Sequence, residues 1–170
     1  MNLSGFFLIV IILITAGSCR SGIEKSDSAN TIPIQALYEG QQCPDHMTGI
    51  TPIRDPQALE NWWQPIAKQQ FPEKPMPSAL AALDFNESDV YVISMGSQAS
   101  AGYDIKLNEN RASLQNGALA IPAEWIRPPP DSMVPQVMTH PCIVIAMPAG
   151  RHKTVAVRNR QGVTLLETRF

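Results

Sequence analysis

Two cysteines and two histidines stand at spacings that could support metal or redox chemistry. Cys43-Pro-Asp-His46 and His140-Pro-Cys142 together supply two sulfur and two nitrogen ligands. In an extended segment His140 and Cys142 would point to the same face, and tetrahedral zinc accepts this ligand set. One-residue spacing is uncommon in structural zinc sites, however, and cysteine pairs in an oxidising compartment usually form disulfides. We therefore favour a Cys43–Cys142 disulfide and keep zinc bound by all four residues as the alternative.

The remaining polar residues form no recognisable catalytic constellation. No serine lies in a Gly-x-Ser-x-Gly motif, and the histidines lie in loops or beside prolines. Acidic pairs such as Glu87 and Asp89 adjoin the start of an expected strand, where solvated charge is ordinary. There is no glycine-rich phosphate loop, and the basic residues do not cluster. We therefore expect a non-enzymatic protein without a cofactor.

The N-terminus combines a short apolar segment with a cysteine. Residues 6–14 (FFLIVIILI) are wholly apolar but fall short of the roughly 20 residues that a transmembrane helix needs. A short apolar stretch followed by small residues is typical of a secretory signal. Ala16-Gly17-Ser18-Cys19 resembles the lipobox of bacterial lipoproteins, in which the cysteine is acylated after cleavage. This resemblance implies a signal peptide at residues 1–18 and lipid on Cys19. An ordinary signal peptide or an uncleaved anchor is the alternative.

Length and charge limit what the rest of the chain can be. Removing residues 1–18 leaves about 150 residues, the length of one ordinary domain. With 13 basic and 15 acidic residues the net charge is −2, which gives no electrostatic reason to expect nucleic acid. Residues 19–31 are small and polar and predict a flexible tether, followed by a single domain at 32–170. Arg20 is not the aspartate that retains lipoproteins at the inner membrane. We therefore expect a lipid-anchored envelope protein on the outer membrane, facing the periplasm.

One helix is predicted early in this domain. Asp55 suits the N-cap, Pro56 the first helical position, and the apolar residues of 59–66 fall on one face. Pro65 should limit the helix to two or three turns. The three prolines of 71–78 predict an irregular connector.

The second half of the sequence predicts β-strands. Residues 108–117 read as a polar turn region, and 134–147 read as an edge or bent strand because Pro135 and Pro141 cannot donate ladder hydrogen bonds. The other expected strands are 90–95, 103–107, 118–121, and the hairpin strands 154–158 and 163–167. We predict a mainly β fold, a small β-sandwich or barrel with one short N-terminal helix packed outside; an α+β arrangement is the alternative.

Two loops are candidates for a binding site. Gly96–Gly102 consists of small residues, and Gly102 would supply a backbone conformation that other residues resist. Arg127–Asp131 is rich in proline and should be stiff and extended. We expect the two loops to cluster at one end of the sandwich and to meet a partner, with Gly96, Gly102, Tyr103 and Trp125 at the contact and the two aromatic rings as anchors.

Several short motifs occur in the order found in a known family. They are Asp84-Phe85, a strand ending at Met95-Gly96, the turn Ala101-Gly102-Tyr103, and 137–142 (VMTHPC) with its apolar strand. Over residues 84–158 the chain is similar to the C-terminal domain of the PrcB family. That family is named for a lipoprotein that associates with a surface protease and stabilises the protease complex. The resemblance implies a non-enzymatic envelope lipoprotein that binds, and stabilises, a partner protein such as a surface protease.

A second resemblance supports an alternative function. The Gly-Tyr loop looks like the inhibitory loop of chagasin-type cysteine-protease inhibitors, which sit on an immunoglobulin-like sandwich. It implies a protease inhibitor that acts through residues 96–103. A zinc-binding domain is the third hypothesis. In each case the expected partners are the membrane, through the N-terminal lipid, and a protein, but no nucleic acid.

Overall fold

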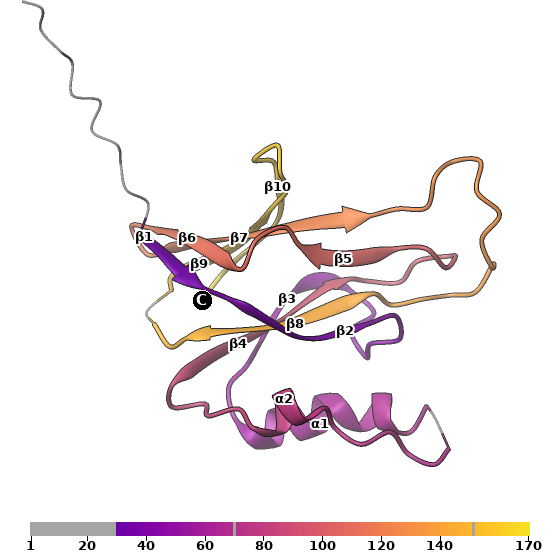
Figure 1. Cartoon of the computed structure of the whole chain (residues 1–170), viewed down its shortest axis with the longest axis horizontal. Helices are drawn as coiled ribbons and strands as arrows, with labels where there is room; N and C mark the ends of the chain where they lie inside the picture. The colour runs from indigo at the N-terminus through magenta and orange to yellow at the C-terminus, as the bar shows by residue number, and fades with distance from the viewer. Residues whose placement is uncertain (1–29, 70, 151) are drawn as a thin grey trace, which may run out of the picture.

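Two β-sheets lie face to face, and two helices cover the outer face of one of them (Figure 1). The computed structural model describes residues 30–69, 71–150 and 152–170. The expected signal peptide and the expected lipidation site, Cys19, lie outside the described residues. The mainly β prediction, a sandwich with a helix on its outside, is confirmed. Within the described ranges no helix is long and apolar enough to cross a membrane.

The first sheet is mixed, with one parallel pair. Its strands follow the order β1 (Asn30–Pro33), β6 (Arg111–Gln115), β7 (Ala118–Ile126), β9 (Thr154–Arg158) and β10 (Thr164–Arg169), and β5 (Asp104–Leu107) pairs with the later part of β7. β7 and β9 run parallel, and every other pair is antiparallel. The hairpin β9–β10 confirms the prediction for 154–167.

The second sheet is wholly antiparallel. Its order is β2 (Gln35–Gly40), β8 (Cys142–Pro148), β4 (Ser88–Met95) and β3 (Thr48–Ile53). β8 and β4 lie at the centre and are largely buried on both faces. The reason is that one face packs on the first sheet and the other packs on the helices, so both alternating sets of side chains meet apolar neighbours.

The alternation of β8 divides the interior into two cores. Ile143, Ile145 and Met147 face the first sheet and join the inter-sheet core with residues such as Ile121 and Val157. Cys142 and Val144 face the other way and pack with the helices, in a core that also contains Leu59, Trp63, Ile66, Leu80 and Val92. Burial of apolar surface on both sides makes β8 the central element of the fold.

Helix α1 (Pro56–Ala67) forms as its local signals predict. The Asp55 carboxylate caps it by accepting a hydrogen bond of 2.7 Å from the backbone N–H of Ala58, and Pro56 occupies the first turn. The helix passes through Pro65 and ends at Ala67, about three turns after its start, close to the expected length. Pro65 is exposed, whereas Ile66 and Ala67 are buried, so packing of the last turn offsets the hydrogen bond that proline cannot donate. A short helix, α2 (Ser78–Ala81), follows.

The residues expected to form a polar turn contain a strand. β6 occupies Arg111–Gln115 and turns at Asn116-Gly117 directly into β7, which runs to Ile126, beyond the short strand expected at 118–121. Asn-Gly between two extended segments is a strong hairpin signal. The isolated residues Ala112 and Leu114 give β6 too weak an alternation to stand out in the sequence, yet they pack against the inter-sheet core.

The strand expected at 134–147 is shorter, and it lies at the centre of its sheet and not at an edge. Regular pairing begins only at Cys142, and residues 134–141 are irregular apart from isolated pairings of Thr139 with Gln98 and of His140 with Gln42. The two prolines therefore precede β8, so they do not force it to an edge. The fold also begins earlier than expected, because Asn30 and Thr31, the last two residues of the expected tether, pair with β6.

Candidate functional site

Three loops meet at one end of the sandwich, on the right of Figure 1. We call this surface the loop face; it comprises residues 41–47 (between β2 and β3), 96–103 (between β4 and β5) and 127–141 (between β7 and β8). Backbone hydrogen bonds connect the loops. Gln98 and Thr139 exchange two of them (2.8 and 2.9 Å), and the Ser97 N–H donates to the carbonyl of His46 (3.1 Å). The expected clustering of loops 96–102 and 127–131 is observed, since Gly102 lies against Pro128, and 41–47 is a third, unexpected member.

Two glycines shape the middle loop. Gly96 has φ +70°, and a Cβ atom there would lie 2.8 Å from the Thr48 backbone nitrogen. Gly102 has φ +91°, and its Cβ would lie 3.1 Å from Pro128 in the neighbouring loop. Positive φ is unfavourable for residues with a side chain, so glycine allows the three loops to approach one another.

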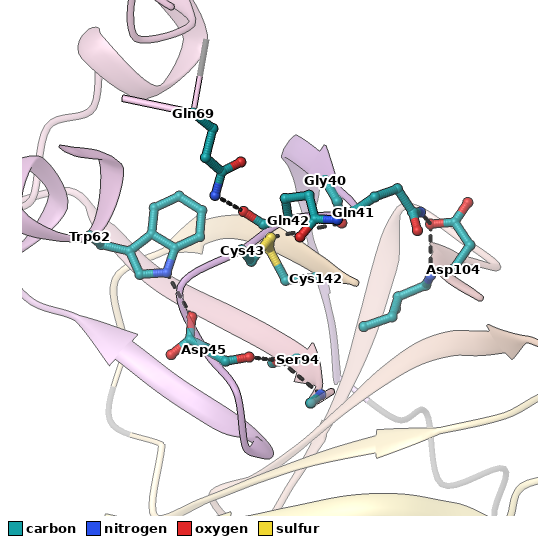
Figure 2. The surroundings of a disulfide bond; sticks show 12 residues. Gly40, Gln41, Gln42, Cys43, Asp45, Trp62, Gln69, Ser94, Asp104 and Cys142 are labelled. Carbon is teal, nitrogen blue, oxygen red and sulfur yellow. Dashed lines mark hydrogen bonds between the residues drawn. A yellow bond between two sulfur atoms is a disulfide. The ribbon is translucent and has the colours of Figure 1, made fainter. Parts of the chain in front are cut away.

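The Cys43–Cys142 disulfide forms as predicted. Both residues are buried in the core between the second sheet and α1, with their Cα atoms 6.1 Å apart, and the bond connects loop 41–47 to the central strand β8 (Figure 2). Because both sulfurs are in this bond, the zinc alternative using Cys43, His46, His140 and Cys142 loses its two thiolate ligands. Among the residues that the structure describes, no group of three or more His, Cys, Asp and Glu side chains is placed to hold a metal ion.

Hydrogen bonds around the disulfide also hold loop 41–47 in place. The Trp62 indole N–H donates to the Asp45 carboxylate at 2.7 Å, and the Ser94 hydroxyl donates to the Asp45 carbonyl at 3.0 Å (Figure 2). From the end of α1, the Gln69 amide donates to the Gln42 carbonyl at 3.0 Å. A helix, a central strand and a covalent bond therefore position this loop, which gives the loop face a preformed backbone.

The two loop-face histidines lie against each other. The rings of His46 and His140 meet edge to face, with their centroids 4.3 Å apart. Partial burial, and then the neighbouring His46, lower the pKa of His140 below its ordinary value of 6.5. The lowered pKa favours the uncharged form of His140, which adds to the low charge of the surface.

The aromatic residues predicted as anchors are only partly exposed. Tyr103 and Trp125 both pack against the inter-sheet core, and the indole nitrogen of Trp125 is buried without a hydrogen-bond partner. Trp125 lies within β7, beside the loop face. Their role as binding anchors stays a prediction.

The apolar side chains that do project from the loop face are different residues. Met47, Met133, Val137 and Met138 are all exposed. We did not predict them as contact residues from the sequence, although one signal was present: all four lie between prolines, where a regular strand is disfavoured. Charged side chains on the loop face are few, namely Asp45, Arg127 and Asp131, and Asp45 is bonded to Trp62. This surface suits contact with an apolar, weakly charged partner.

A cavity of about 930 Å³ lies apart from the loop face. It opens between the sheets where β1 passes into β2, and its lining includes Ile34, Leu107, Asn108, Glu109 and Met147. Its volume falls in the range of small-molecule pockets. None of the predicted site residues lines it, so the two features are separate.

Comparison with known families finds a similarity over the central part of the domain. Residues 90–148 match the family model described as PrcB C-terminal. The match begins in β4, ends in β8, and includes two of the three loops of the loop face. It lies within the 84–158 segment, so the predicted resemblance to this family is confirmed over those residues. Comparisons with curated proteins and with solved structures gave no match.

Proposed function

We propose that this protein is a non-enzymatic lipoprotein of the cell envelope that binds and stabilises a partner protein through its loop face. The observation that carries the proposal is the group of exposed apolar side chains, Met47, Met133, Val137 and Met138, on loops whose backbones are fixed by hydrogen bonds and a disulfide. A preformed apolar surface loses little conformational entropy on binding.

The position of the loop face favours a protein over the membrane as its partner. The described chain starts at β1, at the end of the molecule away from the loops (Figure 1). An N-terminal lipid on Cys19 would attach the chain at that end, and the flexible tether predicted at 19–31 would leave the loop face accessible to a protein. The PrcB C-terminal match makes an envelope protease the first partner to test.

The low charge of the loop face limits the kind of partner. A contact built from methionine, valine and uncharged polar groups draws its affinity from burial of apolar surface. We therefore expect an apolar patch or segment on the partner and weak dependence of binding on salt concentration.

Affinity capture from native envelopes tests the proposal. The tagged, full-length lipoprotein is crosslinked in cells, captured and identified with its partners by mass spectrometry. Val137→Glu should reduce recovery of the partner at least about tenfold, because it places a charge in an apolar contact. Val163→Glu is the matched control, since Val163 is equally exposed (56% against 51% for Val137) but lies in the β9–β10 turn.

Two outcomes would contradict the proposal. One is that no protein is enriched with the wild-type lipoprotein over an unrelated lipoprotein. The other is that Val137→Glu and Val163→Glu capture the same partner as efficiently as the wild type, because binding would then use another surface.

The second candidate function is protease inhibition by loop 96–103. The observation in its favour is that this loop has hydrogen-bonded neighbours on both sides, His46 and Thr139, which would present it as a preformed ridge. Purified protein is assayed against papain-type and serine proteases. Inhibition that disappears with a change in loop 96–103 would support this function, and no inhibition at micromolar concentration would end it.

A further inference from the structure

Three methionines project into solvent from the loop face. Met47 is 83% exposed, Met138 is 63% exposed, and Met133 is fully exposed, whereas Met95 and Met147 are buried in the inter-sheet core. We propose that Met47, Met133 and Met138 are oxidation sites, and that their conversion to sulfoxides by a peroxide weakens binding of the partner. This inference rests on the proposed function, because it assigns regulation to the same surface.

The backbone around each methionine is fixed, so its thioether stays accessible. The residue before Met47, His46, accepts hydrogen bonds at its carbonyl from both the N–H and the hydroxyl of Ser97 (3.1 and 3.3 Å). The carbonyl of Met138 accepts one from the Gln42 amide (3.1 Å). Met133 follows a turn closed by Ser132, whose N–H and hydroxyl both donate to the Pro129 carbonyl (3.0 and 2.7 Å).

The reaction balances with hydrogen peroxide alone. A thioether lone pair attacks one peroxide oxygen, an S–O bond forms, the O–O bond breaks, and the second oxygen leaves as water after proton transfer within the peroxide and solvent. The sulfide is oxidised to a sulfoxide by two electrons, and the peroxide is reduced. The disulfide of the same chain is consistent with oxidising surroundings.

No cysteine thiol in the described part of the chain competes for the oxidant. Both described cysteines, Cys43 and Cys142, are joined in the disulfide. The exposed methionines are therefore the side chains there that a peroxide meets first. Met95 and Met147 become accessible only when the sandwich opens, which is rare in a stable domain.

Oxidation changes the property on which binding depends. A methionine side chain is flexible and apolar and adapts to irregular partner surfaces. The sulfoxide is polar, so placing it in an apolar contact opposes binding, and methionine sulfoxide reductases can reverse the change. The loop face would then bind its partner under ordinary conditions and release it under peroxide stress.

Peptide mapping and capture together test this inference. The full-length lipoprotein is treated with limiting hydrogen peroxide, and sulfoxides are located by mass spectrometry. Met47, Met133 and Met138 should oxidise at least about tenfold faster than Met95 and Met147. Capture of the partner should fall at least about tenfold with peroxide and return after treatment with the reductases.

The triple variant Met47→Leu, Met133→Leu, Met138→Leu is the matched control. Leucine cannot form a sulfoxide, so peroxide should leave capture by the variant at the variant's own untreated level, whatever that level is relative to the wild type. Equal loss of capture by the variant after peroxide would overturn the inference, as would oxidation of Met95 and Met147 at the same rate as the exposed residues. If neither protein captures a partner before peroxide, the proposed function itself fails, and the regulation fails with it.

Discussion

Loss of the Cys43–Cys142 bond should strongly destabilise the fold. The two residues are 99 positions apart, so the bond closes a loop that covers most of the described domain. In the chain-entropy model a closed loop of about 100 residues stabilises the folded state by about 4.7 kcal/mol, by restricting the unfolded chain. We expect reduction to lower the free energy of unfolding by about 4 kcal/mol.

The double variant Cys43→Ala, Cys142→Ala should lose slightly more. Both side chains are buried between α1 and the second sheet, so removing their sulfur atoms also leaves unfilled space in that core. This packing loss adds about 1 kcal/mol. A domain of this size is stable by roughly 5–15 kcal/mol, so the variant should fold but with a much smaller margin.

Urea unfolding measures the loss. With a slope of about 2 kcal/mol per molar urea, 4 kcal/mol moves the midpoint by about 2 M. Unfolding can be followed by tryptophan fluorescence, because Trp62 and Trp63 pack in or against the core that holds the bond. Reduced wild-type protein separates the effect of the crosslink from that of the lost sulfur atoms, since its side chains are unchanged.

Two results would refute this reasoning. A change below about 1 kcal/mol in both the reduced protein and the double variant would mean that loop closure contributes little to stability. Detection of two free thiols, at Cys43 and Cys142, in the folded protein purified without a reducing agent would show that the bond does not form.

Three further predictions follow from single residues. Asp55→Ala should lower the free energy of unfolding by about 1 kcal/mol, since it removes the cap of α1, while Asp55→Asn should retain most of it; urea unfolding of both compares them. Gly96→Ala should lower the free energy of unfolding by about 2 kcal/mol, because residue 96 has a positive φ and a Cβ there would lie close to the Thr48 nitrogen. Gly49→Ala is the control and should not destabilise the fold, because its Cβ would meet nothing within 4 Å. Equal effects of the two variants in urea unfolding would contradict the explanation. Because the pKa of His140 is lowered in the folded state, the imidazole binds a proton more readily in the unfolded chain. The contribution of His140 to the free energy of unfolding should therefore be fully present above about pH 6.5 and decrease as the pH falls toward the folded-state pKa. His140→Gln should flatten that part of the pH profile, and an unchanged profile would show that other groups cause it.

Features that depend on neighbouring residues were predictable. The N-cap of α1 is set by Asp55 and Pro56, and the β9–β10 hairpin by two short apolar strands with a glycine before the second. β2 and β3 were not predicted, because their local strand signals are weak. Each is short and contains glycine, and β3 also contains proline, so neither shows the clear alternation that marks a strand.

Features that depend on distant residues were not predictable. Nothing near Cys142 in the sequence reveals that β8 lies at the centre of its sheet, because strand order is decided by pairing with β2 and β4 far along the chain. For the same reason residues 134–141 looked like the first part of a strand. In the structure they form the loop that carries Val137 and Met138 at the surface.

By itself, the sequence determined the β-rich class, the capped helix and the family resemblance, because these follow from local periodicity, capping chemistry and short motifs. It favoured the Cys43–Cys142 pairing on redox grounds, and the structure decided between that bond and the zinc alternative. Only the tertiary structure decided which residues form the candidate site. Backbone hydrogen bonds between 41–47, 96–103 and 127–141 bring together loops separated by up to about a hundred residues, half-bury Tyr103 and Trp125, and leave three methionines in solvent. Exposure of a side chain depends on what packs over it, and that is a property of the assembled fold.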